Sequence, residues 1–290
     1  MVSAKSKPKL LAIVGETASG KSGLALKIAK AHRGEIISAD SWTVYRGFDI
    51  GTAKSTITQQ KAVKHHLIDV RDPAEGFNAP LFKELAQKAI KDIKKRGKLP
   101  ILAGGTGLYV DSVLYDYGFL PNSGERRQLD AMRLDELLVL AGSRKIDLSG
   151  IDTRNKRRVI RAIEAGGQKP TKGELLAGTL IIGLKIDNQA LRQRVEERTD
   201  KMLAAGLERE VKELAEKYGW DIEPMKGIGY REWREYFEGD QTLEQTRVRI
   251  ISATMNLAKR QRTWFKRNPD IRWFGSTTEA DSYISQVLNT

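Results

Sequence analysis

A glycine-rich loop near the N-terminus constrains the fold of this chain more than any other stretch. Residues 15–22 read Gly-Glu-Thr-Ala-Ser-Gly-Lys-Ser, which matches the pattern G-x-x-x-x-G-K-[ST] of phosphate-binding loops. Glycines let consecutive backbone N–H groups turn toward one anion, while the lysine supplies a positive charge and the last hydroxyl can bind Mg²⁺. An apolar run precedes the loop at residues 10–14, and apolar residues recur at helical spacing over 24–29. We predict a strand, a phosphate-binding loop and a helix whose N-terminus faces the bound anion. That anion could belong to ATP, GTP or the diphosphate of another molecule.

Two further strands are predicted to end beside this loop. Residues 35–38 lead into Asp40 and Ser41, and residues 99–103 lead into Gly-Gly-Thr-Gly with its threonine at Thr106. The carboxyl ends of parallel strands meet at one edge of a sheet, where ligands bind, so these side chains should lie near the loop. Asp40 is the candidate for binding Mg²⁺ or accepting a proton, and a carboxylate that only caps a turn is the alternative. Thr106 stays open between a hydroxyl that acts in the site and an ordinary turn threonine.

The remaining patterns predict an α/β core with one helical insertion. Helical signals cover residues 78–96, 191–217 and 243–267, and strand signals cover residues 65–70 and 179–186. Residues 122–178 carry few β-rich runs and several helical patterns. We therefore expect a P-loop NTPase-like parallel sheet flanked by helices, built from residues 1–121 and 179–290. A small helical insertion domain at residues 122–178 should interrupt it.

Two arginines on the predicted helix over residues 191–217 lie one turn apart. Arg194 and Arg198 share a face there, and their like charges repel mildly unless an anion lies between them. Salt bridges to Glu197 or Glu208 on the same helix are the alternative. The residues alone leave both interpretations open.

The positive charge of the chain is concentrated in two stretches. The formal net charge is +13. Residues 154–172 hold seven Lys or Arg against one Glu, and residues 245–274 hold eight against one Asp, so these stretches carry the whole excess. In the second stretch, aromatic residues alternate with basic ones at residues 259–266, a pattern that suits nucleic acid with an unstacked base. A polyanion longer than a nucleotide is the predicted partner, and solvated helix faces are the alternative.

The absence of cysteine removes several classes of site. A chain of 290 residues with no cysteine has no disulfide, no thiolate zinc site and no thiol nucleophile, which fits a reducing compartment. His65 and His66 would point to opposite faces of a strand, so they are not expected to bind one metal together. The short apolar run after the basic residues 1–9 supports neither a signal peptide nor a membrane span. We expect a cytoplasmic protein.

Beyond these patterns, the chain resembles the tRNA dimethylallyltransferases, which attach an isopentenyl group to N6 of the adenosine just 3′ of the anticodon. The resemblance is carried by an ordered series of segments that spans most of the chain, at residues 15–22, 40–41, 44–47, 50–54, 65–69, 104–109, 158–164, 202–207, 227–231 and 258–264. The phosphate-binding loop is common to many enzymes, whereas the series as a whole is specific to this family.

The resemblance implies a reaction and a set of residues for it. The loop would hold the diphosphate of dimethylallyl diphosphate through Gly15, Thr17, Ala18, Ser19, Gly20, Lys21 and Ser22, with Ser22 also on Mg²⁺. Arg198 would neutralise charge as the C–O bond breaks, Asp40 would accept a proton from the adenine N6, and Thr106 would orient the amine. The target base would have to leave the stack of the anticodon loop to reach them.

The resemblance also implies tRNA contacts through the anticodon stem-loop. The residues concerned are Asp40, Ser41, Trp42, Thr43, Arg157, Arg158, Arg161, Lys226, Gly229, Tyr230, Arg231, Lys259, Arg260, Gln261, Trp264 and Lys266. Separately, we expect a monomer.

This chain departs from the family at several positions, and two other functions remain as alternatives. Glu16 stands where the family commonly has proline, Thr43 and Arg157 stand where it commonly has glutamine, and the insertion is shorter than usual. These departures concern loop contacts and RNA selectivity. A P-loop small-molecule kinase would share the loop and Asp40 but leaves the basic stretches unexplained. A non-catalytic RNA-binding module leaves Asp40, Thr106 and Lys21 without a role.

Overall fold

The computed structural model describes residues 7–120 and 124–289. The chain divides into two compact units, Met1–Leu114 with Leu175–Thr290, and Tyr115–Glu174. Each unit is described by itself. The expected domain boundary at residues 121 and 122 lies outside the described residues.

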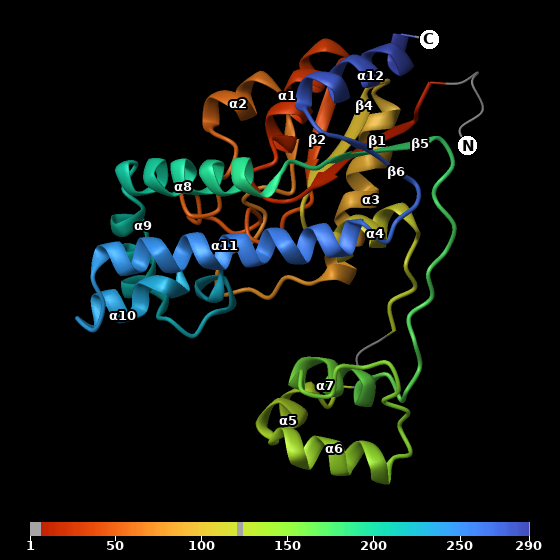
Figure 1. The fold of residues 1–290 in the computed structure, drawn as a ribbon. Helices are drawn as coiled ribbons and strands as arrows, with labels where there is room; N and C mark the ends of the chain where they lie inside the picture. The colour runs from red at the N-terminus through yellow and green to blue at the C-terminus, as the bar shows by residue number, and fades with distance from the viewer. Residues whose placement is uncertain (1–6, 121–123, 290) are drawn as a thin grey trace. The chain divides into compact units, whose positions relative to one another are not determined.

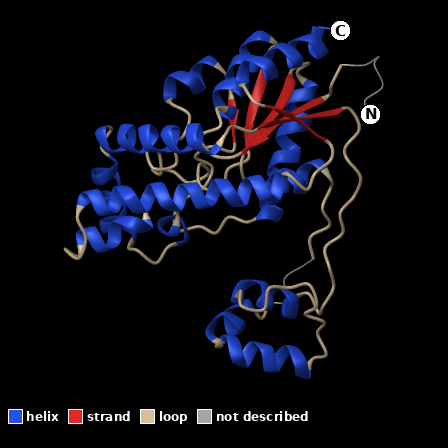
Figure 2. Ribbon diagram, in the orientation of Figure 1, coloured by secondary structure: helices blue, strands red, loops and turns tan. Residues whose placement is uncertain are grey.

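A six-stranded parallel sheet forms the centre of the first unit, in the order β3-β2-β4-β1-β5-β6 (Figures 1 and 2). Its strands are β1 (Leu10–Gly15), β2 (Gly34–Ser38), β3 (His65–His66), β4 (Leu99–Gly104), β5 (Thr179–Leu184) and β6 (Ile271–Phe274). β1 pairs with β4 on one side and β5 on the other, so the loop after β1 leaves from the middle of the sheet. The predicted parallel sheet with flanking helices is confirmed.

Helices cover both faces of the sheet because its strands are apolar on both sides. All six residues of β1 are buried. On one face, α1 (Lys21–Ala31) and α12 (Thr277–Asn289) share a hydrophobic core with β1 residues Leu11 and Ile13. The helices α3 (Ala79–Lys95), α4 (Gly107–Leu114) and α11 (Leu243–Phe265) contact the sheet as well (Figure 1). The predicted start of α3 holds, since the Asn78 side chain accepts a hydrogen bond from the Leu81 N–H at 3.0 Å.

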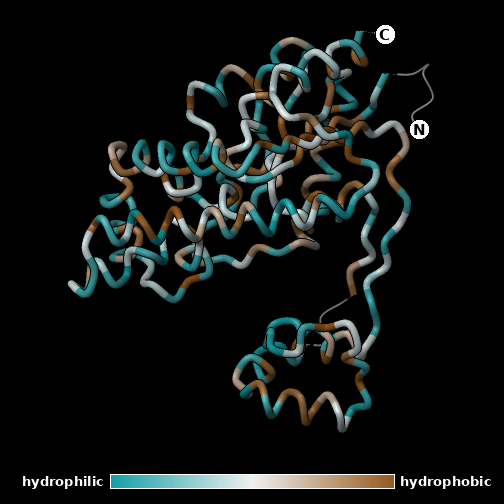
Figure 3. The backbone as a smooth tube through the Cα atoms, viewed as in Figure 1, coloured by the Kyte–Doolittle hydropathy of each residue, from teal (hydrophilic) through white to brown (hydrophobic). Residues whose placement is uncertain are grey.

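Helices from the last third of the chain form a second layer beside the sheet. It contains α8 (Asn188–Ala204), α9 (Leu207–Tyr218), α10 (Arg234–Phe237) and α11, with short 3₁₀ turns at Glu223–Lys226 and Arg231–Trp233. The tubes of α8 and α11 alternate between hydrophilic and hydrophobic colours, as amphipathic helices do (Figure 3). The prediction of one helix over residues 191–217 is wrong, because Gly206 adopts a left-handed conformation with φ 96° and separates α8 from α9.

The strand predicted over residues 65–70 is shorter than expected. Only His65–His66 pair with β2, and the chain then turns at Leu67 and Asp69, both with positive φ. His65 Nδ1 lies 2.7 Å from the Val63 carbonyl oxygen, whereas His66 Nε2 lies 2.7 Å from Glu35. The two rings therefore serve different partners. A short helix, α2 (Ile57–Ala62), precedes this strand.

The second unit is helical. It contains α5 (Arg126–Ala131), α6 (Leu134–Ser143) and α7 (Lys156–Glu164). Leu129, Leu137, Val159, Ile160 and Ile163 form its small hydrophobic core. Among the described residues of the whole chain, no helix has both the length and the apolar character needed to cross a membrane.

A buried carboxylate near the edge of the sheet makes the stability of the fold sensitive to acid. Glu35 is 2% exposed and lies 2.8 Å from Lys98, 2.7 Å from His66 and 2.6 Å from Arg96. Burial alone would raise the pKa of Glu35, but these hydrogen bonds outweigh it and lower the pKa from 4.5 to about 2. A carboxylate with a lowered folded-state pKa stabilises the fold above its unfolded pKa, and this contribution is lost as the pH falls toward 2.

We expect Glu35→Gln to lower the free energy of unfolding by about 3 kcal/mol at pH 7, with a difference from wild type that shrinks between pH 4.5 and pH 2. Urea titrations of both proteins at several pH values measure this difference in the free energy of unfolding. Glu75→Gln is the control, because the Glu75 side chain is 47% exposed and its ion pair with Arg71 should contribute less than about 1 kcal/mol. An equal loss for Glu35→Gln at pH 7 and pH 2.5 would contradict the assignment.

Candidate active site

The loop between β1 and α1 has the backbone that its glycines predict. Gly15 has φ 149°, and a Cβ there would lie 2.6 Å from the Leu184 carbonyl oxygen. Gly20 has φ 94° and caps α1 in a left-handed conformation. The Ser19 N–H donates to the Glu16 carbonyl at 3.2 Å, which closes the turn. The loop therefore wraps over the N-terminus of α1, where the first N–H groups have no partner in the helix and attract anions.

Two polar groups of the loop, one buried and one half-buried, are suited to an anion. Within the described residues, the Ser19 hydroxyl is buried and has no hydrogen-bond partner. Lys21 Nζ donates to the Glu16 carbonyl at 3.0 Å. Burial lowers the pKa of Lys21 to about 8, and Arg198 adds to the shift whereas Asp40 and Glu16 oppose it. A partly desolvated ammonium and an unpaired hydroxyl are both stabilised when an anion enters the loop.

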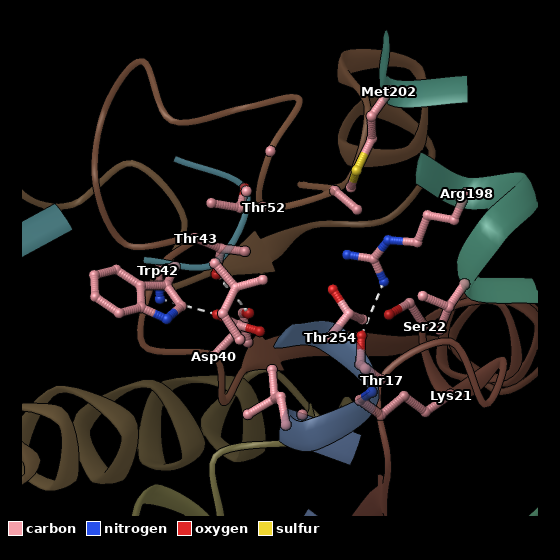
Figure 4. A pocket seen from close by; sticks show the side chains of 18 of the residues that line it. Thr17, Lys21, Ser22, Asp40, Trp42, Thr43, Thr52, Arg198, Met202 and Thr254 are labelled. Atoms are coloured by element: carbon pink, nitrogen blue, oxygen red, sulfur yellow. Dashed lines mark hydrogen bonds between the residues drawn. The ribbon is translucent and has the colours of Figure 1, made fainter. Parts of the chain in front are cut away.

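Arg198 reaches the loop from α8. Its Nη1 donates to Thr17 Oγ1 at 3.1 Å (Figure 4). Burial lowers its pKa, and the charge of Asp40 opposes the shift. The alternative was a salt bridge from Arg198 to Glu197 or Glu208. Instead, the Glu197 carboxylate accepts from Gln193 and the Glu208 carboxylate accepts from Tyr236. Arg198 therefore adds a second half-buried cation beside Lys21.

Asp40 lies at the end of β2, on the other side of the cavity from Arg198 (Figure 4). Its Oδ1 accepts from the Trp42 N–H at 2.9 Å, so it does cap a turn as the alternative predicted. Its carboxylate also lines the cavity. The loop after β4 comes close to it, because Gly104 packs against Ala39 so tightly that a Cβ would lie 2.1 Å from the Ala39 carbonyl oxygen.

Thr106 braces the turn that carries Asp40. Its Oγ1 accepts from the Ser41 N–H at 3.3 Å, and its own N–H donates to the Ala39 carbonyl at 3.2 Å. An accepting hydroxyl keeps its proton available for another group. Both interpretations of Thr106 therefore fit the geometry.

The loop, Asp40 and Arg198 surround one cavity of about 140 Å³. Of the residues singled out from the sequence, nine line it: Thr17, Lys21, Ser22, Asp40, Trp42, Thr43, Arg198, Gly229 and Gln261. A second, more open hollow of about 890 Å³ shares Lys21, Ser22, Arg198 and Met202 with it. The two cations therefore lie where both spaces meet.

Sequence reasoning missed the apolar and hydroxyl residues that complete the cavity wall. Val195, Thr199 and Met202 come from α8, and Ile250, Thr254 and Leu257 come from α11. Their spacing by three or four residues, in line with Arg198 and Gln261, was the available signal. Gly51 and Thr52 line the cavity as well, from a segment that the sequence singled out only through the family resemblance at residues 50–54.

Glu210 of α9 orders the loop that carries Gly51 and Thr52. Its carboxylate accepts from the N–H groups of Asp49, Ile50 and Gly51 at 3.2, 2.8 and 3.1 Å. The Tyr230 hydroxyl donates to the same carboxylate at 2.7 Å, and the Tyr230 side chain is 1% exposed. Tyr230, singled out for tRNA binding, therefore supports this loop from within, and its neighbour Gly229 lies in the cavity wall.

The other candidates for tRNA binding differ in exposure. Lys226, Arg231, Lys259, Arg260 and Lys266 are exposed in the first unit, and Arg157 and Arg158 are exposed in the second. Arg161 is half-buried, where it bonds to Glu164 and to the Leu120 carbonyl. Trp264 is 37% exposed, and its indole N–H donates to Asp111 at 2.9 Å while the ring packs on Gly107.

The cavity combines a phosphate-binding loop and two cations with the carboxylate of Asp40, an arrangement that can hold a phosphate or diphosphate group and act on it as an enzyme. The family model described as IPP transferase matches residues 43–268, which is more than half of the chain. The chain belongs to this family.

Relatives and solved structures agree with that assignment. The chain is 43% identical to a tRNA dimethylallyltransferase of Pediococcus pentosaceus over 283 residues, which cover 92% of this chain and 90% of the relative. It is 38% identical to that of Bacillus subtilis, with 97% of this chain and 95% of the relative covered.

Among solved structures, the chain is similar to a tRNA isopentenylpyrophosphate transferase from Bacillus halodurans. Identity is 36%, the TM-score is 0.74, and 98% of this chain and 97% of that chain are covered. A eukaryotic dimethylallyltransferase acting on tRNA has 25% identity and a TM-score of 0.75, with 96% of this chain and 76% of that chain covered.

Proposed function

We propose that this enzyme transfers a dimethylallyl group from dimethylallyl diphosphate to N6 of the adenosine 3′ of the anticodon in tRNA, with release of diphosphate. Family membership supports the transfer to tRNA. The observation that carries the chemistry is the cavity itself, in which Lys21 and Arg198 lie across from the carboxylate of Asp40 (Figure 4). Cations stabilise a leaving diphosphate, whereas an amine that loses a proton needs a base. The two groups therefore need opposite charges on opposite sides of the cavity.

The phosphate-binding loop would hold the diphosphate. The unpaired Ser19 hydroxyl, Lys21 and the N–H groups at the start of α1 are the donors available to it. Arg198, fixed through Thr17, would face the bridging oxygen on which negative charge grows as the C–O bond breaks. These donors are in place before the substrate arrives, so little reorganisation is needed during the reaction.

Asp40 would accept the proton that the adenine N6 amine loses as the new C–N bond forms. An aromatic amine is a weak nucleophile, and a positioned base makes it competent. The Trp42 N–H donates to Oδ1, and the amine would donate to the other carboxylate oxygen, Oδ2. Thr106, which holds the next residue in place, would hydrogen bond to the same nucleotide from the other side.

Mg²⁺ is part of the proposal. The described residues hold no group of three or more His, Cys, Asp or Glu side chains that would bind a metal by themselves. The Ser22 hydroxyl lines the cavity and would hold Mg²⁺, since this ion takes few protein ligands and keeps water and substrate phosphate oxygens. When bound with the diphosphate, Mg²⁺ would neutralise part of the charge that leaves with it.

The tRNA would be bound by exposed basic residues of both units. Lys259, Arg260 and Lys266 project from the last turns of α11 and just beyond it, and Arg158 projects from α7. Phosphate contacts of this kind position an RNA, and a base extruded from the anticodon loop would enter the cavity. A tRNA substrate implies a cytoplasmic enzyme, and we propose that it acts as a monomer.

One assay tests the proposal against the kinase alternative, which the comparisons do not favour. The protein is incubated with Mg²⁺, tRNA and either dimethylallyl diphosphate or ATP, and nucleosides are then analysed by mass spectrometry. We expect isopentenyladenosine only with dimethylallyl diphosphate. Phosphoryl transfer from ATP without isopentenyladenosine would contradict the proposed function.

A further inference from the structure

The phosphate-binding loop contains a carboxylate that its function does not explain. Glu16 follows the first glycine of the loop, and its side chain is 1% exposed. A buried negative charge next to a site for diphosphate repels that ligand and is costly to desolvate. Its presence therefore requires a cation that neutralises it.

Arg262 of α11 supplies that cation through a bidentate ion pair. Its Nε lies 2.7 Å from Glu16 Oε2 and its Nη2 lies 2.8 Å from Oε1. The same guanidinium donates to Asn188 Oδ1 at 2.6 Å and to the Ile186 carbonyl at 3.2 Å. Every nitrogen of Arg262 is therefore engaged inside the protein. Such a fork is the strongest geometry for an arginine and a carboxylate.

The position of Arg262 in the chain suggests a different role from the one its contacts show. It belongs to the basic stretch at residues 245–274, whose charge predicts contact with RNA, and it follows the exposed Arg260 by two residues. Its side chain is nevertheless only 25% exposed and turned toward the loop. The helix α11 thus carries solvent-exposed cations, such as Arg260, and one cation, Arg262, that pairs with the phosphate-binding loop.

The residue before Arg262 holds the next residue of the loop. Gln261 Oε1 accepts from the Thr17 N–H at 2.7 Å, and its amide packs on Gly105, where a Cβ would lie 2.3 Å from Nε2. Consecutive residues of α11 therefore hold consecutive residues of the loop. The two loop residues held in this way, Glu16 and Thr17, in turn accept hydrogen bonds from Lys21 and Arg198.

A shift of Glu16 would reach the groups that face the diphosphate. The Glu16 carbonyl accepts from Lys21 Nζ at 3.0 Å and from the Ser19 N–H at 3.2 Å. The Thr17 hydroxyl accepts from Arg198 at 3.1 Å. Displacing this backbone by about 1 Å moves the donors out of the geometry on which ligand binding depends.

We propose that Glu16 and Arg262 are positioning residues, whose ion pair fastens the phosphate-binding loop to α11 and thereby sets its affinity for diphosphate. Arg262 acts through the loop and makes no contact with tRNA. The identity of the ligand rests on the proposed function. The role of the pair rests on the contacts.

The test compares Glu16→Gln, Arg262→Gln and the double variant in the full-length protein. Titration calorimetry gives the Kd of inorganic diphosphate with Mg²⁺, and steady-state assays give KM for dimethylallyl diphosphate and for tRNA. We expect each single variant to raise the Kd of diphosphate and the KM of dimethylallyl diphosphate by about tenfold or more, since each breaks the ion pair and leaves one charge without its ionic partner beside the loop. The KM for tRNA should stay within about twofold of wild type.

The double variant and a conservative variant separate positioning from loss of folding. Glu16→Gln with Arg262→Gln leaves no unpaired charge, so its loss should be smaller than the two single losses combined. Arg262→Lys keeps the charge without the fork and should fall between wild type and Arg262→Gln. If the single variants do not fold, a wild-type Kd for diphosphate in the double variant overturns the proposal.

Asp200→Asn is the matched control. Asp200 accepts a bidentate pair from Arg247, which lies on the same helix as Arg262 and has the same exposed fraction, at 2.6 and 3.0 Å. It lies outside the loop and should leave the Kd of diphosphate unchanged. A raised KM for tRNA in Arg262→Gln with an unchanged Kd for diphosphate would make Arg262 an RNA contact and overturn the proposal. Diphosphate binding requires no transfer, so this comparison holds even where the protein fails to modify tRNA.

Discussion

Replacing Asp40 by asparagine should lower kcat for dimethylallyl transfer by a factor of about 10³ or more. Asparagine keeps the shape of the side chain and an oxygen that accepts from the Trp42 N–H, so the turn after β2 should persist. It removes the basic oxygen that would take the proton from the adenine amine. The loss should therefore appear in kcat, measured by incorporation of labelled dimethylallyl groups into tRNA.

Binding measurements provide the control for Asp40→Asn. The Kd for tRNA and the Kd for diphosphate should stay within about threefold of wild type, because the cations at the other side of the cavity are unchanged. Asp40→Ala should lose the same activity and some stability, since the Trp42 N–H then loses its acceptor. Wild-type turnover in Asp40→Asn would remove Asp40 from the role of base.

Arg198→Ala should lower kcat/KM for dimethylallyl diphosphate by a factor of about 10² to 10³. Arg198 is a half-buried cation whose guanidinium is held against the loop by Thr17. Its charge is most useful when the leaving diphosphate becomes more negative, so kcat should fall together with the affinity for the substrate. Arg198→Lys should recover only part of the loss, because an ammonium lacks the planar fork.

A second arginine of α8 serves as the control for Arg198. Arg192 is 66% exposed and pairs with Glu196 at 2.8 Å, so Arg192→Ala should change kcat/KM by less than about twofold. Steady-state kinetics at saturating tRNA measures both variants. Unchanged kinetics in Arg198→Ala would leave this arginine with a structural role only.

The parts of the site that were predictable from the sequence are those that local chemistry determines. The phosphate-binding loop is recognisable because glycines, a lysine and a serine have to occur at fixed spacing over residues 15–22. Asp40 and Thr106 follow from the rule that parallel strands deliver their ends to one edge. The structure brings both to the turn beside the loop. Their roles in the reaction stay predictions.

What the sequence did not predict depends on contacts between distant segments. The partners of Glu16 and Thr17 lie on α11, at the other end of the chain, and nothing in the residues around the loop points to them. Tyr230 looks like a surface aromatic in a segment rich in glycine, yet its ring is buried beside Phe48. The end of α8 was missed because apolar spacing continues across Gly206, whose left-handed conformation breaks the helix.

The order of strands in the sheet also has a consequence for biosynthesis. β1 is flanked by β4 and by β5, and β5 follows the whole second unit in the chain. The contacts that hold the phosphate-binding loop come later still, from Gln261 and Arg262. A nascent chain therefore contains the loop well before it contains the supports of that loop, which form only once α11 has left the ribosome. Full affinity for the substrate should thus arise only after α11 has been synthesised.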